Sequence, residues 1–205
     1  MTRPVPTIAV TGPTGAGKSL FCRLLADRGA VVVDADREGH AVLDEPAVRD
    51  AVTAAFGGDI LGEDGRIDRA LLGPRVFADG AARARLDALV HPALAGACDR
   101  ALARARAGHP PLVILEAAVY FLLPGPPAVD MTLTVTAPPD VRLARLLASG
   151  LGEARARARI DAQAHLEPHW LGADRIIVNE GSEADLAEAA RSLWRDLVAP
   201  DPAGG

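Results

Sequence analysis

Short, uninterrupted hydrophobic runs alternate with longer amphipathic segments along most of this sequence. The runs occupy residues 6–10, 30–34, 112–116, 131–136 and 175–179 and consist mainly of Val, Ile, Leu, Ala and Thr. Runs of this length without polar alternation are typical of strands buried on both faces, as in a parallel sheet between helices. The pattern therefore predicts an α/β fold in which a parallel β-sheet is sandwiched by helices.

Apolar residues recur at helical spacing between these runs. Helices are expected from Ser19 onward and at 46–56, 68–77, 81–89, 92–107, 138–148, 153–165 and 182–198. Ser182 suits the N-cap of the last helix, because its hydroxyl can accept a hydrogen bond from the first turn. Pro92 suits the first turn of a helix, so a break between two helices is expected at His91.

The all-helical stretch in the middle of the chain interrupts the alternation of strands and helices. We interpret it as a helical substrate-binding insertion at about 60–110, within a single domain spanning 6–198. The helices after the fourth strand predict a small helical lid at about 142–165. Residues 199–205, rich in Pro and Gly, are expected to form a flexible tail.

A glycine-rich phosphate-binding motif, G-x-x-x-x-G-K-[ST], joins the first strand to the first helix. It consists of Gly12, Pro13, Thr14, Gly15, Ala16, Gly17, Lys18 and Ser19, and Leu20 continues the helix. Glycines let successive N–H groups turn inward, Lys18 brings a charge to the β- and γ-phosphates, and Ser19 offers a ligand for Mg²⁺. The strand–loop–helix context supports the motif, so these residues predict a nucleoside triphosphate site with Mg²⁺ as a cofactor.

Acidic residues follow two of the predicted strands. The second strand ends in Asp34-Ala35-Asp36, and the third ends in Glu116. Since catalytic groups of parallel sheets gather at the carboxyl ends of strands, Asp36 is the candidate general base and Glu116 is expected near Mg²⁺. The alternatives are that Asp34 and Asp36 cap the next helix, and that Glu116 is a solvated carboxylate.

Cationic side chains on the lid segment could offset phosphate charge. Arg145 is the better candidate there, with Arg142 nearby, whereas Arg155, Arg157 and Arg159 point to different helix faces and are interpreted as a solvated surface. The alternative for Arg145, as for the last three, is a solvated surface position. A lone histidine such as His91 is also more often structural than functional.

Composition narrows the class of protein. The 205 residues are 49% hydrophobic and 24% charged, with a formal net charge of −5, which argues against a broad nucleic-acid surface. No apolar run approaches the roughly 20 residues that span a bilayer, so we expect a cytoplasmic protein with no membrane partner. Cys22 and Cys98 are expected to be buried and reduced, and a monomer or a small homo-oligomer are both compatible with the sequence.

Several segments in order resemble the dephospho-CoA kinase family over about residues 7–193. Besides the phosphate loop, they are Val33-Asp34-Ala35-Asp36, Gly65-Arg66-Ile67-Asp68-Arg69-Ala70-Leu71-Leu72, Leu89-Val90-His91-Pro92, Ala158-Arg159-Ile160-Asp161-Ala162-Gln163 and Ala173-Asp174-Arg175-Ile176-Ile177-Val178-Asn179-Glu180-Gly181-Ser182. The resemblance implies a P-loop NTPase-type fold and ATP-dependent phosphorylation of the ribose 3′-hydroxyl of dephospho-CoA, giving coenzyme A and ADP.

The same resemblance implies roles for individual residues. It makes Asp36 the base, Lys18 and Arg145 the phosphate clamps, and Ser19 the Mg²⁺ ligand. Residues expected at the acceptor are Asp36, Arg69, His91 and Glu116, and those expected near the adenine of ATP are Asn179 and Gly181.

Three departures from the family pattern leave alternatives open. Residues 116–122 lack the usual proline and final acid, Ser149 stands where the lid usually carries a second arginine, and the usual lysine before Ala173-Asp174 is absent. The alternatives are a divergent P-loop kinase for another small hydroxyl acceptor, and a nucleotide-binding protein with little turnover.

Overall fold

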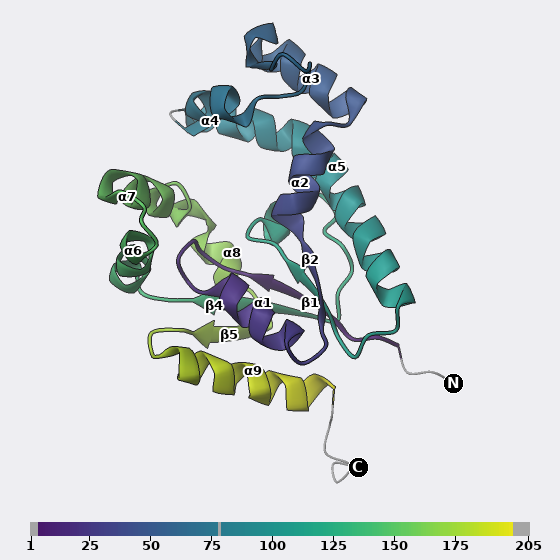
Figure 1. The fold of residues 1–205 in the computed structure, drawn as a ribbon, viewed down its shortest axis with the longest axis vertical. Coiled ribbons are helices and arrows are strands. Elements are labelled where there is room, and N and C mark those ends of the chain that lie inside the picture. The colour runs from purple at the N-terminus through teal and green to yellow at the C-terminus, as the bar shows by residue number, and fades with distance from the viewer. Residues whose placement is uncertain (1–3, 78, 199–205) are drawn as a thin grey trace. The chain divides into compact units, whose positions relative to one another are not determined.

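The computed structural model describes residues 4–77 and 79–198, and Figure 1 labels its helices and strands. The predicted tail at 199–205 lies outside the described residues. The described residues form two compact units, and the single domain expected over 6–198 stays a prediction. Of the described residues, the first unit comprises 4–34, 101–121 and 128–198, and the second comprises 35–77, 79–100 and 122–127.

A parallel sheet forms the centre of the first unit. Its strands are β1 (Thr7–Thr11), β2 (Val31–Asp34), β3 (Val113–Glu116), β4 (Met131–Thr136) and β5 (Arg175–Val178). In the part of the chain that the structure describes, they lie in the order β2-β3-β1-β4-β5, and each neighbouring pair is parallel. The parallel sheet predicted from the hydrophobic runs is therefore confirmed.

Helices α1 (Lys18–Ala26) and α9 (Glu183–Leu197) cover one face of this sheet (Figure 1). Ile8 and Val10 of β1 share a buried core with Phe21 of α1 and Leu193 of α9. They alternate along the strand because successive side chains point to opposite faces. On the other face Thr11 is buried, and its hydroxyl donates to the Ala118 carbonyl at 3.2 Å, which satisfies the polar group.

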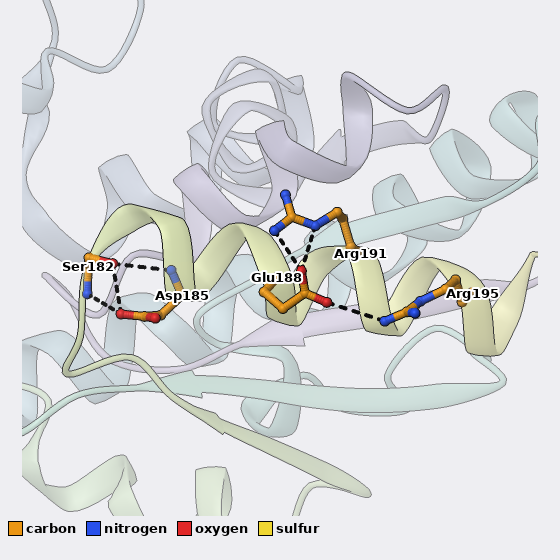
Figure 2. Close-up of polar contacts among 5 residues, drawn as sticks. All are labelled: Ser182, Asp185, Glu188, Arg191 and Arg195. Atoms are coloured by element: carbon orange, nitrogen blue, oxygen red, sulfur yellow. Dashed lines mark hydrogen bonds and ion pairs between the residues drawn. The ribbon is translucent and has the colours of Figure 1, made fainter.

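Helix α9 begins with a capping box, shown in Figure 2. The Ser182 hydroxyl accepts a hydrogen bond from Asp185 N at 3.3 Å, and the Asp185 carboxylate accepts one from Ser182 N at 2.8 Å. Further along the helix, Glu188 pairs with both Arg191 and Arg195. The N-cap role predicted for Ser182 is confirmed.

Three short helices follow β4 in the first unit. They are α6 (Pro139–Ala148), α7 (Glu153–Asp161) and α8 (Glu167–Leu171). The helix expected over 153–165 ends earlier, at Asp161, and a 3₁₀ turn (Ala164–Leu166) leads into α8. Pro168 lies in the first turn of α8, where a proline costs no hydrogen bond.

The second unit is helical. It contains α2 (Ala35–Leu43), α3 (Pro46–Phe56), the 3₁₀ turn Gly58–Ile60, α4 (Arg69–Phe77) and the part of α5 (Gly80–Ala107) up to Arg100. Val42, Val52, Ile60 and Leu72 form its buried core. Helices α2 and α3 contribute to this core, and the unit begins at Ala35.

The helix break expected at His91 is wrong, because helix α5 continues through this position. The helix runs through Pro92 without interruption, although an interior proline lacks an N–H and crowds the preceding turn. Apolar residues on both sides of the proline, including Leu89 and Ala97, pack against the same core. Tertiary packing on both sides therefore outweighs the local preference for a break.

Both cysteines are buried, as the sequence predicted. Burial raises the pKa of the Cys22 thiol well above its ordinary value, and it raises the pKa of Cys98 to about 11. Such thiols stay protonated near neutral pH and are poor nucleophiles. Among the described residues, no helix combines the length and the apolar character needed to cross a membrane.

Candidate active site

The loop between β1 and α1 has a conformation that requires its glycines. Gly12, Gly15 and Gly17 have φ values of +128°, +76° and +99°, which residues with a Cβ rarely adopt. A Cβ on Gly12 would lie 2.1 Å from the Val135 carbonyl oxygen, and a Cβ on Gly17 would lie 2.4 Å from Asn179 Nδ2. The glycines therefore serve both the backbone turn and the close approach of β4 and Asn179.

Helix α1 starts directly after this loop, so its first N–H groups are available to a ligand in the loop. Lys18 Nζ donates to the Pro13 carbonyl at 3.0 Å, which holds the ammonium against the loop. Leu20 packs against the hydrophobic core, so only its backbone is available to a ligand. Inward N–H groups beside a lysine make a concave site for a polyphosphate.

The end of β3 brings Glu116 to the start of α1. Ser19 Oγ donates a hydrogen bond to Glu116 Oε1 at 2.6 Å. In the sheet register, Glu116 lies beside Asp34 at the end of β2. Hydroxyl and carboxylate oxygens are the ligands that Mg²⁺ prefers.

No group of three or more His, Cys, Asp or Glu residues within 4–77 and 79–198 could hold a metal ion by itself. Mg²⁺ usually keeps several waters and takes further oxygens from substrate phosphates. The pair of Ser19 and Glu116 beside a phosphate-binding loop fits that mode of binding.

Arg145 of α6 joins the phosphate loop to the segment after β5. Its guanidinium donates to the carbonyl oxygens of Asn179 at 2.9 Å, Ala16 at 3.5 Å and Gly181 at 3.5 Å, and to Asn179 Oδ1 at 3.4 Å. Asn179 is buried, and its Nδ2 donates to the Ala16 carbonyl at 2.8 Å. These contacts bring together four residues that the sequence assigned to the nucleotide.

Arg142, one turn earlier on α6, lies against the phosphate loop. A Cβ on Gly15 would lie 2.8 Å from the Arg142 carbonyl oxygen and 3.1 Å from its Cβ. Arg142 Nε is buried and has no hydrogen-bond partner in the described part of the chain. Burial lowers the pKa of Arg142, and the charge of Glu167 acts in the opposite direction. A buried donor without a partner is costly, so an acceptor supplied by a ligand would stabilise this side chain.

Ser149, at the place of the usual second lid arginine, caps the end of α6. Its hydroxyl donates to the Leu146 carbonyl at 2.7 Å, and its N–H bonds to the Arg145 carbonyl. The residue closes the last helical turn and supplies no charge.

The other predicted residues belong to the second unit and lie on three different helices. Asp36 is in the first turn of α2, Arg69 is the first residue of α4, and His91 is within α5. His91 is buried, with its Nε2 3.6 Å from Asp87 Oδ1 one turn earlier. Arg69 contacts the Nε2 atom of His40 on α2.

Sequence reasoning assigned no role to Gln163 or His40. Gln163 Oε1 accepts a hydrogen bond from Thr14 N at 2.7 Å, which fixes a backbone group of the phosphate loop. Gln163 stands in a segment that carried the family resemblance, but its spacing alone does not indicate a contact with Thr14. His40 lies one helical turn after Asp36, and this spacing would have been visible had α2 been predicted.

Comparison with known proteins gives a consistent result across the chain. A protein-family model described as Dephospho-CoA kinase matches residues 6–185. A dephospho-CoA kinase from Anaeromyxobacter dehalogenans is 39% identical over 193 residues, covering 93% of this chain and 91% of the relative. One from Streptomyces avermitilis is 40% identical over 194 residues, covering 93% of each.

A solved structure extends this similarity to the fold. The crystal structure of TT1252 from Thermus thermophilus superimposes with a TM-score of 0.75 at 31% sequence identity. The match covers 95% of this chain and 99% of the other. The similarity therefore includes both units and is not confined to the phosphate loop.

Proposed function

The chain belongs to the dephospho-CoA kinase family, and we propose that one set of its polar residues binds ATP and another set binds the acceptor. The enzyme transfers the γ-phosphoryl group of ATP to the ribose 3′-hydroxyl of dephospho-CoA, the last step of coenzyme A synthesis. In our proposal, residues of the first unit bind ATP and residues of the second unit bind the acceptor.

Asp36 acts as the general base. The 3′-oxygen of the acceptor attacks the γ-phosphorus, its proton passes to the Asp36 carboxylate, and the bond from phosphorus to the β–γ bridging oxygen breaks to release ADP. Phosphoryl transfer needs an oriented hydroxyl more than a strong base, so Asp36 both orients the hydroxyl and accepts the proton.

The phosphate loop and Lys18 bind the β- and γ-phosphates. Support comes from the glycine-dependent turn, which directs backbone N–H groups inward, and from the position of Lys18 over the loop. Asn179 and Gly181 line the adenine side through their backbone groups in this proposal. Since their carbonyl oxygens already accept from Arg145, that arginine positions the adenine-side segment.

The phosphate clamp is better assigned to Arg142 than to Arg145. Arg145, to which the sequence assigned the clamp, already donates to the carbonyl oxygens of Ala16 and Asn179. Arg142 lies against Gly15 and has a buried nitrogen in need of an acceptor. Its position and unmet hydrogen-bonding capacity favour contact with a phosphate oxygen.

Ser19 and Glu116 are the residues proposed to hold Mg²⁺ with the phosphates of ATP. Their oxygen atoms, 2.6 Å apart, match the hard ligands that this ion prefers. When bound, Mg²⁺ would neutralise charge on the β- and γ-phosphate oxygens. Glu116 thus serves the nucleotide in this proposal, although the sequence also grouped it with the acceptor residues.

The main support for this assignment of residues is the hydrogen bond between Ser19 and Glu116 beside the glycine-rich turn. The test is a coupled ADP-release assay with ATP, Mg²⁺ and dephospho-CoA, run beside pantetheine, adenosine and shikimate as acceptors. We expect ADP release to depend on dephospho-CoA and to exceed release with the other acceptors. No acceptor-dependent ADP from dephospho-CoA would overturn the proposal.

The cytoplasmic location and the monomeric or small homo-oligomeric state expected from the sequence are also proposals. Light scattering on the purified protein tests the second of them.

A further inference from the structure

A cavity of about 360 Å³ lies in the second unit, between α2, α4 and the segment that precedes α4. Its lining includes His40 and Asp44 from the α2 side, Arg66 and Asp68 from the preceding segment, and Arg69 from α4. We propose that this cavity binds the diphosphate group of the acceptor, through Arg69 and His40. The inference rests on the proposed function, because it assigns one group of dephospho-CoA to one part of the acceptor site.

The acidic residues around the cavity already have hydrogen-bond donors or cationic partners. Arg66 lies 3.5 Å from Asp44 and 3.9 Å from Asp64, and Asp68 accepts a hydrogen bond from Ala70 N at 2.7 Å. Arg66 is therefore balanced by two carboxylates. The remaining cation of the cavity is Arg69.

Arg69 has no carboxylate partner within the residues that the structure describes. Its hydrogen bond there is to His40 Nε2, which can accept only when the imidazole is neutral. A guanidinium has five N–H donors in a planar fork, and that fork matches the oxygens of a phosphate. An anion in the cavity would accept hydrogen bonds from the Arg69 guanidinium, and an imidazole whose Nε2 accepts from Arg69 carries a proton on Nδ1 that it can donate.

The spacing along α2 links this cavity to the proposed base. Asp36 and His40 are four residues apart, which places them on one face of the helix with a rise of about 6 Å between them. In dephospho-CoA the 3′-hydroxyl and the 5′-diphosphate are attached to the same ribose ring. One rigid helix can thus present a carboxylate to the hydroxyl while His40 and Arg69 hold the diphosphate.

A purely structural role would have different consequences. If the contact between Arg69 and His40 served only to fasten α4 to α2, its loss would reduce activity equally with every acceptor. If the pair binds the diphosphate, its loss would reduce the preference for acceptors that carry this group. Adenosine has the ribose hydroxyls but no phosphate, so the ratio of kcat/KM for dephospho-CoA to kcat/KM for adenosine separates the two roles.

The experiment compares the wild-type protein with Arg69→Gln, His40→Gln and the control Arg49→Gln. Arg49 pairs with Asp50 on α3 and does not line the cavity. We expect Arg69→Gln to lower the ratio by about 10- to 100-fold, as for loss of a charge-assisted hydrogen bond, and His40→Gln to lower it by a smaller factor. The control variant keeps the wild-type ratio.

Isothermal titration of each protein with dephospho-CoA in the absence of ATP gives a second measure. A 10- to 100-fold rise in Kd for Arg69→Gln, with an unchanged melting temperature, supports the inference. An unchanged ratio together with an unchanged Kd in both variants would overturn it. If the wild-type protein fails to phosphorylate dephospho-CoA at all, the proposed function fails, and the titration still decides whether the cavity binds the diphosphate.

Discussion

The hydroxyl of Ser19 donates to Glu116 Oε1 over 2.6 Å, joining the last residue of the phosphate loop to the last residue of β3. The two residues are 97 positions apart in the sequence. Parallel pairing of β1 with β3 brings them together, because Val10 lies beside Glu116 in the register and the loop starts just after β1. The position of the proposed Mg²⁺ site therefore follows from strand order as well as from the motif.

Glu116→Gln is expected to weaken the use of Mg²⁺. The amide keeps the size of the side chain but removes its charge, so we expect the Mg²⁺ concentration for half-maximal activity to rise by about 10- to 100-fold. The measurement is ADP release over a Mg²⁺ titration at saturating ATP. Glu153→Gln, at an exposed ion pair with Arg157, is the control for loss of one charge. An unchanged Mg²⁺ dependence would exclude Glu116 from the metal site.

Asp36→Asn is expected to remove most of the turnover and to leave ATP binding nearly intact. General bases typically contribute about 10²- to 10⁴-fold, so kcat should fall by that factor. ATP affinity should change little, because our proposal assigns the nucleotide to residues of the first unit. The checks are kcat with dephospho-CoA and the Kd of a non-hydrolysable ATP analogue. Turnover at the wild-type rate would remove Asp36 as the base.

The strands of the sheet could be predicted from the sequence because each is a short run rich in apolar residues, although only the inner strands β1 and β3 are buried almost throughout and the edge strands β2 and β5 are partly exposed. The helix α2 could not. Gly39 lies in the middle of this helix, and glycine is among the least favourable residues in a helix interior, so local preference argues against a helix there. The helix is held by packing: Val42 is fully buried, and Leu94 of α5 lies within 4.0 Å of the Cβ position of Gly39.

The candidate site also contains residues that the sequence predicts and residues that it does not. The phosphate loop, Ser19 and Asn179 could be assigned from motifs, because their spacing is specific. The partners of Arg145 are mainly backbone carbonyl oxygens, which every residue carries and no motif identifies. The cavity beside Arg69 depends on α2, and its second ligand-binding candidate, His40, could not be found without that helix.

Arg142→Gln and Arg145→Gln are expected to have different effects. Loss of a cation that stabilises the transition state can cost about 10³-fold or more, so kcat should fall by that order in Arg142→Gln while the melting temperature changes little. Arg145→Gln removes four hydrogen bonds, three to Asn179 and Gly181 and one to Ala16 of the phosphate loop, so it should lower the melting temperature and weaken ATP binding. Steady-state kinetics and thermal melts on both variants measure this.

The control for both arginines is Arg157→Gln, since Arg157 is exposed and pairs with Glu153 on the same helix. A large fall in kcat with normal stability in Arg145→Gln, together with little change in Arg142→Gln, would assign the phosphate clamp to Arg145 instead.

Gly12→Ala is expected to destabilise the protein. The added Cβ would lie 2.1 Å from the Val135 carbonyl oxygen of β4, a backbone atom that cannot move aside cheaply, and φ is +128°. A strained backbone position with such a clash costs on the order of 2–4 kcal/mol, or about 5–15 °C in melting temperature for a chain of this size. Gly58→Ala, with nothing within 4 Å of its Cβ position, is the control. Equal melting temperatures for the two variants would contradict this account of the loop.

Ser182→Ala is expected to lower the melting temperature in a manner that depends on pH. Hydrogen bonds from the Ser182 hydroxyl and N–H lower the pKa of Asp185 below its ordinary value of about 3.8. A carboxyl group whose pKa is lower in the folded state stabilises the fold above its unfolded pKa, and this contribution is lost as pH falls through the folded pKa. The wild-type protein should therefore melt above Ser182→Ala at pH 7, and the difference should shrink below about pH 4 as Asp185 gains a proton. Thermal melts of both proteins between pH 7 and pH 3 measure the effect, with Ser192→Ala on the same helix as the control. A difference that stays constant over this range would show that the hydroxyl caps α9 without the help of the Asp185 charge.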